Sequence, residues 1–207
     1  MSLKIVVGSK NLSSWSLRPW LALAVTGAPF TEEVVQLDKP DTKERLLARS
    51  PTGKVPVLID GALAIHESLA ICEYLAERFP EAQLWPADQG ARAMARAYSC
   101  EMHAGFASLR REMPMHLTKR VTKAPTAEVA ADIARLSTIF RTTRDAYGGD
   151  GAYLFGRYSI ADAMFTPVAT RFRSYGVAIE DPVARDYCTS LLSHSAFVRW
   201  EAAAKLE

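Results

Sequence analysis

The chain has 207 residues, 49% of them hydrophobic, and a formal net charge of +2 at pH 7. This length allows one large domain or two small ones, and the apolar content is sufficient for a hydrophobic core. The small net charge and the dispersed Lys and Arg residues argue against a nucleic-acid partner.

The first part of the chain predicts strands that alternate with helices. In order, the expected elements are a strand over 3–8, a polar loop over 9–14, a helix that ends at Gly27, a strand over 30–37, a turn over 39–41 and a short helix over 42–49. The first helix is indicated by apolar residues at helical spacing between Leu17 and Val25. This alternation predicts a small sheet with parallel pairs and right-handed crossovers.

Residues 50–75 predict a loop, a hairpin and a helix. Two short apolar runs, 57–60 and 63–66, are separated by Gly61, which is a hairpin signal. Ser68 is a suitable N-cap for the helix that follows, because its hydroxyl can accept from a free backbone N–H.

Pro56 lies where this hairpin begins. A proline that enters a strand cannot donate to the ladder, and an X-Pro bond is the common place for a cis peptide. A cis Val55-Pro56 bond would expose the N–H and C=O of Val55 to a peptide-like ligand, which would add as a strand. Glu67 and Ser68 follow at a helix N-terminus, a natural seat for a carboxylate.

The second part of the chain predicts only helices. Residues 80–88 contain two prolines and predict a linker, after which Ala, Leu, Arg and Glu dominate, as in a helical bundle. Prolines at 114 and 125 and glycines between 148 and 151 separate the long helical regions. The sequence therefore predicts one domain over 1–79, a linker over 80–88 and an all-helical domain over 89–207.

Ser159 and Asp162 have the spacing of a capping box at the start of a later helix. In a capping box, the serine hydroxyl accepts from the third helical N–H, and the acidic side chain accepts from the serine N–H. We therefore expect Asp162 to be a folding determinant and not a catalytic residue.

Three motifs resemble the glutathione transferase family. They are Ser-Pro-Thr-Gly-Lys-Val-Pro-Val-Leu over 50–58, Glu-Ser-Leu-Ala-Ile-Cys-Glu-Tyr-Leu over 67–75, and Gly-Arg-Tyr-Ser-Ile-Ala-Asp over 156–162. The resemblance implies an α/β thioredoxin-like N-terminal domain followed by an all-α bundle. It also implies glutathione as cosubstrate, with Val55 and Pro56 pairing with its cysteinyl backbone and Glu67 and Ser68 holding its γ-glutamyl end. Further candidates for binding glutathione are Lys39 and Lys54.

An enzyme of this family must favour the thiolate of glutathione, because the thiolate is the nucleophile. A thiol pKa near ~8.5 leaves the thiol mostly protonated, and lowering it by roughly 2 units requires about 2.7 kcal/mol. The activating donor is expected between the first strand and the first helix. Residues 11–18 contain no tyrosine or cysteine, so the resemblance implies a serine-type, zeta- or theta-like, bacterial-type cytosolic enzyme.

Three serines in this stretch are candidates. A proline is tolerated in the first helical turn, so Pro19 predicts that Ser16 is the N-cap and that Ser13 and Ser14 remain on the loop. The run Ser-Ser-x-Ser-x-Arg is similar to the zeta class, which implies Ser13 as the thiol activator. The distance in sequence from Ser14 to Arg18 is similar to theta-like enzymes, so Ser14 is the alternative. Arg18 is expected either to add positive potential or to form a surface or interdomain ion pair.

The function implied by the resemblance is transfer of glutathione to a small electrophile, typical of detoxification. The alternatives are a glutathione-dependent isomerase of the maleylacetoacetate type and a non-catalytic glutathione-fold binding protein. Two departures distinguish this chain from zeta-class isomerases: Trp15 replaces a small cysteine and Glu67 replaces a glutamine. Candidates for the second-substrate pocket, for which core packing is the competing interpretation, are Tyr98, Met102, Phe106, Met113, Met115, Arg171 and Tyr175.

Cofactors, partners and location follow from residue usage and from the family. The three cysteines are odd in number and form no CxxC pair, which favours reduced thiols in the cytoplasm. The four histidines lack metal-ligand spacing, so no metal is expected. No apolar run is long enough for a membrane span, and the N-terminus does not resemble a signal peptide. A homodimer is expected from the family alone.

Overall fold

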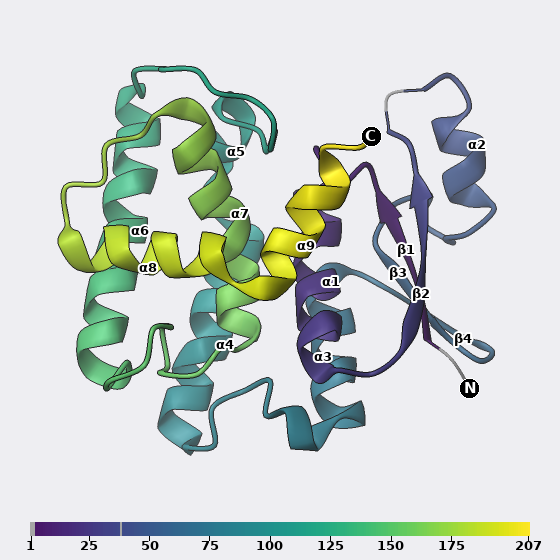
Figure 1. Ribbon diagram of the computed structural model, residues 1–207, viewed down its shortest axis with the longest axis horizontal. Helices are drawn as coiled ribbons and strands as arrows, with labels where there is room; N and C mark the ends of the chain where they lie inside the picture. Colours follow the sequence, from purple (N-terminus) through teal and green to yellow (C-terminus); the bar gives the residue numbers. More distant parts are fainter. Residues whose placement is uncertain (1–2, 38) are drawn as a thin grey trace.

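The computed structural model describes residues 3–37 and 39–207. Figure 1 shows a small sheet with its helices on one side of the molecule and a larger group of helices on the other. The predicted first domain, 1–79, includes residues 1, 2 and 38, which lie outside the described residues.

The sheet has four strands in the order β2-β1-β3-β4. Their bounds are β1 Leu3–Gly8, β2 Phe30–Val35, β3 Val57–Asp60 and β4 Leu63–His66. Only β1 and β2 are parallel, whereas β3 is antiparallel to both β1 and β4, so the sheet is mixed. The second strand ends two residues earlier than expected. The backbone N–H of Leu37 donates instead to Ser9 Oγ at 2.8 Å.

Alternation along β1 places helices on both faces of the sheet. Ile5 and Val7 belong to the large core with α1 (Ser14–Thr26) and α3 (Ser68–Arg78). Val6 packs in a small cluster that contains Leu46 of α2 (Thr42–Leu47), on the opposite face. This arrangement follows from the two-residue period of strand side chains. It leaves α1 and α3 between the sheet and the remaining helices.

The stretch 50–75 forms the predicted hairpin and helix, and the Val55-Pro56 bond is cis, as expected. The capping prediction for Ser68 is wrong. The N-cap of α3 is Glu67, which makes no side-chain capping bond, and Ser68 is the first helical residue. The reason is the backbone of Glu67, whose φ of 80° is not helical, whereas Ser68 already has helical geometry. The helix therefore starts one residue earlier than a Ser68 cap would require.

The helical part contains six α-helices among the described residues. They are α4 Gln89–Ala104, α5 Ala107–Glu112, α6 Ala127–Tyr147, α7 Ile160–Tyr175, α8 Pro182–Ser193 and α9 Ser195–Ala204. A short 3₁₀ turn, Pro80–Ala82, lies within the predicted linker. The boundary at 80–88 stays a prediction, since one continuous hydrophobic core joins α1 and α3 to these helices. No helix of the described chain is long and apolar enough to cross a membrane.

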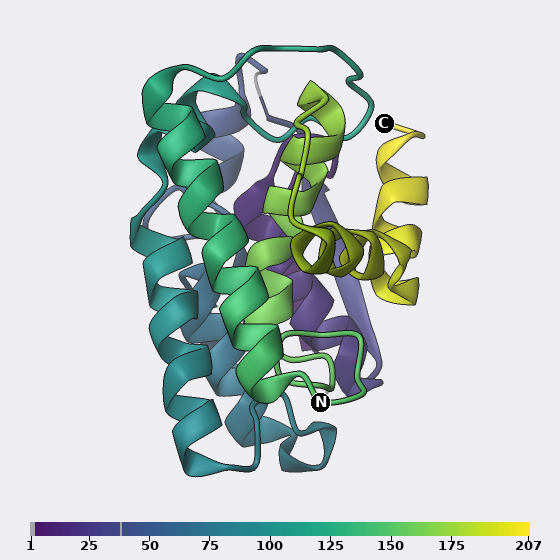
Figure 2. The ribbon, with the colours of Figure 1, turned by 90° about the vertical axis from the view of Figure 1, so that its left-hand side faces the viewer.

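Helix α7 runs through the middle of this group, with α4 and α6 side by side in front of it (Figure 2). All of its residues except Arg173 are buried. Such a helix cannot take its polar partners from water, so the groups at its first turn must be satisfied within the protein.

The predicted capping box is present at the start of α7, and Asp162 is fully buried. Its carboxylate accepts from Ser159 N at 2.8 Å, Ser159 Oγ at 2.9 Å, Leu154 N at 3.1 Å and Tyr187 Oη at 2.9 Å. Burial raises the pKa of Asp162 to about 6, while these donors oppose the shift. The predicted capping box is therefore confirmed, and these contacts support the prediction that Asp162 is a folding determinant.

Replacing Asp162 with alanine should leave several buried donors without an acceptor. We expect Asp162→Ala to lower the free energy of unfolding by about 2–4 kcal/mol, measured by urea denaturation. Asp145→Ala, which removes an exposed carboxylate from α6, is the matched control and should have little effect. Equal stability of the two variants would contradict the capping argument.

Candidate active site

Two neighbouring cavities lie where the first turn of α1 faces the loop before β3. Both are lined by Trp15, Lys54 and Val55. The first, of about 260 Å³, is completed by Thr52, Pro56, His66, Glu67 and Ser68. The second, of about 430 Å³, is completed by Leu12, Ser13, Ser14, Leu37, Leu46, Gly53, Arg110, Pro114, Met115 and Arg171. Most of the sequence-predicted site residues therefore lie around one continuous region.

The first cavity contains a polar group that the protein leaves unsatisfied. Ser68 is 1% exposed, and its Oγ has no hydrogen-bond partner among the described residues. A buried hydroxyl without a partner costs free energy, so native proteins rarely keep one without a reason. Together with the start of α3, this hydroxyl makes the cavity suitable for an oxygen-rich ligand group.

Glu67 has an unusual backbone at the edge of the same cavity. Its φ of 80° lies in a region that L-residues rarely adopt, and such residues are concentrated at functional sites. Its Oε2 lies 3.2 Å from Nε2 of His103, which belongs to α4 of the helical part. Sequence analysis missed His103, because nothing local in the sequence indicates a contact between residues so far apart.

The first turn of α1 differs from the prediction in its capping residue. Ser13 is the N-cap, and its Oγ accepts from Ser16 N at 3.3 Å. The Ser13 hydroxyl donates to Ser16 Oγ at 2.8 Å, and Ser16 Oγ also accepts from Gly8 N at 3.0 Å. The prediction that Ser16 is the N-cap is therefore wrong. Pro19 is the sixth residue of α1 and lies inside the helix, so it does not mark the first turn. The Ser16 hydroxyl is engaged by Gly8 and Ser13, and Ser13 caps the helix instead.

Ser14 is oriented differently from Ser13. As the first residue of α1, it lies at the positive end of the helix dipole. Its Oγ accepts from Nη2 of Arg171, on α7, at 3.2 Å. No described residue accepts a hydrogen bond from the Ser14 hydroxyl, so its hydrogen is available to a ligand in the second cavity.

Contacts from the helical part hold the loop that precedes these serines. Nε1 of Trp200, in α9, donates to the carbonyl of Lys10 at 2.9 Å. Leu117 N donates to Asn11 O at 3.1 Å, and Thr118 N donates to Asn11 Oδ1 at 3.1 Å. The position of Ser13 and Ser14 therefore depends on both parts of the molecule.

Arg18 is fully buried, which contradicts the expectation of a surface residue. Its Nε donates to the carbonyl of Met164, in α7, at 3.2 Å, so the interdomain contact exists but its partner is a carbonyl and not a carboxylate. Burial, and then the charges of Arg110 and Arg171, lower the pKa of Arg18. Trp15 supplies a compensating π-face, with the guanidiniums of Arg18 and Arg110 centred 4.5 Å and 4.8 Å from its ring.

The other sequence-predicted residues separate into two groups. Lys54 is exposed and lines both cavities, whereas Lys39 is exposed and lines neither. Among the second-substrate candidates, Met115 and Arg171 line the second cavity. Core packing holds the others, which are Met102, Phe106, Met113 and Tyr175, together with the partly buried Tyr98.

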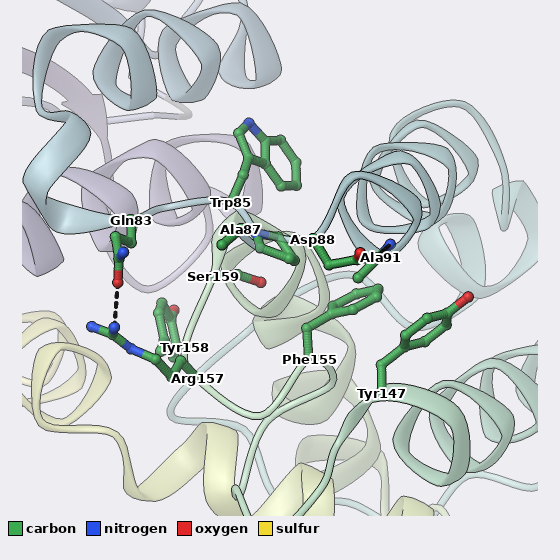
Figure 3. A pocket seen from close by; sticks show the side chains of 11 residues that line it. Gln83, Trp85, Ala87, Asp88, Ala91, Tyr147, Phe155, Arg157, Tyr158 and Ser159 are labelled. Atoms are coloured by element: carbon green, nitrogen blue, oxygen red, sulfur yellow. Dashed lines mark hydrogen bonds between the residues drawn. The ribbon is translucent and has the colours of Figure 1, made fainter.

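A separate cavity of about 440 Å³ lies away from these residues (Figure 3). Aromatic side chains dominate its walls, and Arg157 donates to Gln83 at its edge. Of the predicted motifs, only the one over 156–162 contributes to it, through Arg157, Tyr158 and Ser159. In the described part of the chain, no group of three or more His, Cys, Asp and Glu side chains could hold a metal ion.

Comparison with known proteins finds a family match in the N-terminal part of the chain. Residues 12–78 match the family model described as "Glutathione S-transferase, N-terminal domain". A probable maleylacetoacetate isomerase from Caenorhabditis elegans is 38% identical over 51% of this chain, and the match spans only 50% of that relative. A maleylacetoacetate isomerase from Pseudomonas aeruginosa is 28% identical over 94% of this chain and 93% of its own length.

Solved structures extend the similarity to the whole chain. A maleyl pyruvate isomerase, described as a bacterial glutathione S-transferase of the zeta class, aligns over 97% of both chains with a TM-score of 0.71 and 26% identity. A glutathione transferase homologue from Burkholderia, with bound glutathione, aligns over 100% of both with a TM-score of 0.77 and 21% identity. Residues 12–78 therefore match the glutathione S-transferase N-terminal domain, and the whole chain has the fold of the solved glutathione transferases. Its thioredoxin-like sheet domain followed by a helical bundle is the architecture expected from its motifs.

The contacts of Ser16 predict a structural role. Ser16→Ala should leave the buried donors of Gly8 and Ser13 without an acceptor, which lowers the free energy of unfolding by about 1–3 kcal/mol. Urea denaturation measures this loss, and Ser190→Ala, which removes an exposed helical hydroxyl, is the control. A Ser16→Ala protein as stable as the control would show that these two bonds contribute nothing.

Proposed function

We propose that this protein is a glutathione transferase that activates the glutathione thiol for attack on a small electrophile. The observation that carries the proposal is the position of Ser14, whose uncommitted hydroxyl faces a cavity that adjoins the cis-proline cavity. The family supports glutathione as the cosubstrate, and the orphaned hydroxyl of Ser68 fits a ligand carboxylate.

Each residue has a stated role in this proposal. The backbone of Val55, beside Pro56, pairs with the cysteinyl part of glutathione. Ser68 donates to its γ-glutamyl carboxylate and Glu67 accepts from its ammonium, while Lys54 and Lys39 add positive charge for its carboxylates. In the reaction, the thiolate sulfur forms a bond to the electrophilic carbon, and the leaving group departs with its bonding electrons.

Ser14 and not Ser13 is the proposed thiolate donor. The hydroxyl hydrogen of Ser13 is committed to Ser16, and that of Ser14 is not. We also propose that the protein is a cytoplasmic homodimer active in detoxification. Its two domains would comprise residues 1–79 and 89–207. The three cysteines of the described chain are free thiols, which agrees with a reducing compartment.

The serine assignment predicts a shift in the thiol pKa. A hydrogen bond to a charged group contributes about 1.5–3 kcal/mol, so Ser14→Ala should raise the pKa of bound glutathione by ~1–2 units. The thiolate absorbance of bound glutathione, titrated against pH, measures this shift. Ser13→Ala is the matched control and should lose stability without a comparable shift. A shift confined to Ser13→Ala would assign the role to Ser13.

The orphaned hydroxyl of Ser68 predicts an unusual separation of stability and binding. Ser68→Ala removes a hydroxyl that has no partner in the protein, so the free energy of unfolding should not decrease. Glutathione affinity should fall by about 1–3 kcal/mol, or roughly 5- to 150-fold. Calorimetry measures the affinity, with Ser190→Ala as control. Unchanged affinity would place the γ-glutamyl group elsewhere.

The arginines of the second cavity favour one alternative, a glutathione-dependent isomerase of maleyl dicarboxylates. We consider four arginines of the helical part for such a substrate. Arg110 and Arg171 line the cavity, whereas Arg111 and Arg173 pair with Glu112 and Glu201. Turnover of maleylacetone in the presence of glutathione, well above that of an aryl halide, would favour the isomerase. No turnover of maleylacetone would exclude it.

A further inference from the structure

Arg171 carries a buried positive charge, which is energetically unfavourable. It is 3% exposed at the boundary between α7 and α1, and it has no carboxylate partner among the described residues. Its Nη1 donates to the carbonyl of Pro167 at 3.1 Å, its Nη2 donates to Ser14 Oγ at 3.2 Å, and its Nε has no partner. A buried charge is costly unless it is paired, so this position implies a purpose other than stability.

The surroundings of Arg171 are also positively charged. Arg110 of α5 lines the same cavity, as does the exposed Lys54, and Arg18 of α1 is buried nearby. Burial and the charge of Arg110 lower the pKa of Arg171 to about 10, so Arg171 stays protonated at neutral pH. Tyr175, on the same helix as Arg171, opposes that shift. The carboxylate of Glu67, which contacts His103, raises the pKa of Arg18 against the effect of burial.

We propose that Arg171 is a positioning residue that acts through the Ser14 hydroxyl on the thiol of glutathione. This proposal rests on the proposed function. The guanidinium occupies a lone pair of Ser14 Oγ, which leaves the hydroxyl hydrogen directed elsewhere. A hydroxyl that accepts from a cation is a stronger donor, because hydrogen bonds in a chain polarise one another. The thiol proton passes to water, and the Ser14 hydroxyl then donates its hydrogen to the thiolate sulfur.

The proposal makes thiol activation a joint property of both domains. Ser14 comes from the first turn of α1, whereas Arg171 reaches it from the helical domain, anchored to the carbonyl of Pro167. A residue that served only to bind an anionic electrophile would have no influence before that electrophile is present. The thiol titration in glutathione alone therefore separates the two roles.

The test is a double-mutant cycle on the thiolate absorbance of bound glutathione, with no electrophile present. The proteins are the wild type, Arg171→Met, Ser14→Ala and the double variant. Arg171→Met should raise the apparent thiol pKa by about 1 unit or more. In the Ser14→Ala background the same change should add little, because coupled residues are not additive. Additive shifts would overturn the action through Ser14.

Arg111→Met is the matched control, because it removes a positive charge from an exposed position of the same domain. It should leave the titration unchanged. If Arg171→Met does not fold, Arg171→Gln takes its place, because it keeps a polar side chain. The thiol pKa is expected to rise by the same amount in this variant. A wild-type titration in Arg171→Gln would overturn the inference. Absence of thiolate in the wild type itself would instead overturn the proposed function.

Discussion

The geometry of the second cavity, which Ser14 and Arg171 line, depends on one buried carboxylate. Asp162 accepts four hydrogen bonds and so fixes where α7 begins. Because α7 is buried along its length and packs against α1, its start also sets the position of Arg171 relative to Ser14. A shift of this helix by one residue would rotate Arg171 by about 100°, away from the serine. A folding determinant far from the cavity thus governs its geometry.

The charge balance at the domain boundary is the second constraint. Burial lowers the pKa of Arg18, Arg110 and Arg171; the charges of Arg110 and Arg171 further lower the pKa of Arg18, and that of Arg110 further lowers the pKa of Arg171. Their compensation comes from backbone carbonyls and from the ring of Trp15. Because Arg18 and Arg171 are buried, water screens their charges only weakly. An anionic ligand, and a thiolate in particular, is what this region favours.

Trp15 distinguishes the two cavities of this protein from the zeta-class pattern. It lines both cavities, contacts two guanidiniums and packs edge-on against His103, with ring centroids 5.2 Å apart. At the same position, the zeta-class pattern has a small cysteine. The larger ring connects the serine-bearing helix to His103 and Arg110 of the helical domain.

Local chemistry explains which predictions succeeded. The hairpin, the cis bond before Pro56 and the capping box at Asp162 each depend on a few adjacent residues, so their signals are visible in the sequence. The predictions that Ser16 and Ser68 are N-caps were wrong, because the observed N-caps are Ser13 and Glu67. A helix can start at several neighbouring positions, and long-range bonds such as that from Gly8 N to Ser16 select one of them.

The sequence by itself determined the resemblance of its motifs to glutathione transferases, the two-part architecture and the set of candidate serines. Only the tertiary structure decided which hydroxyl is free, because Ser13 and Ser14 are neighbours with the same chemistry. It also decided that Arg18 is buried and that His103 reaches Glu67. These facts arise from the packing of α4 and α7 against the first domain, and contacts between residues distant in sequence leave no local pattern.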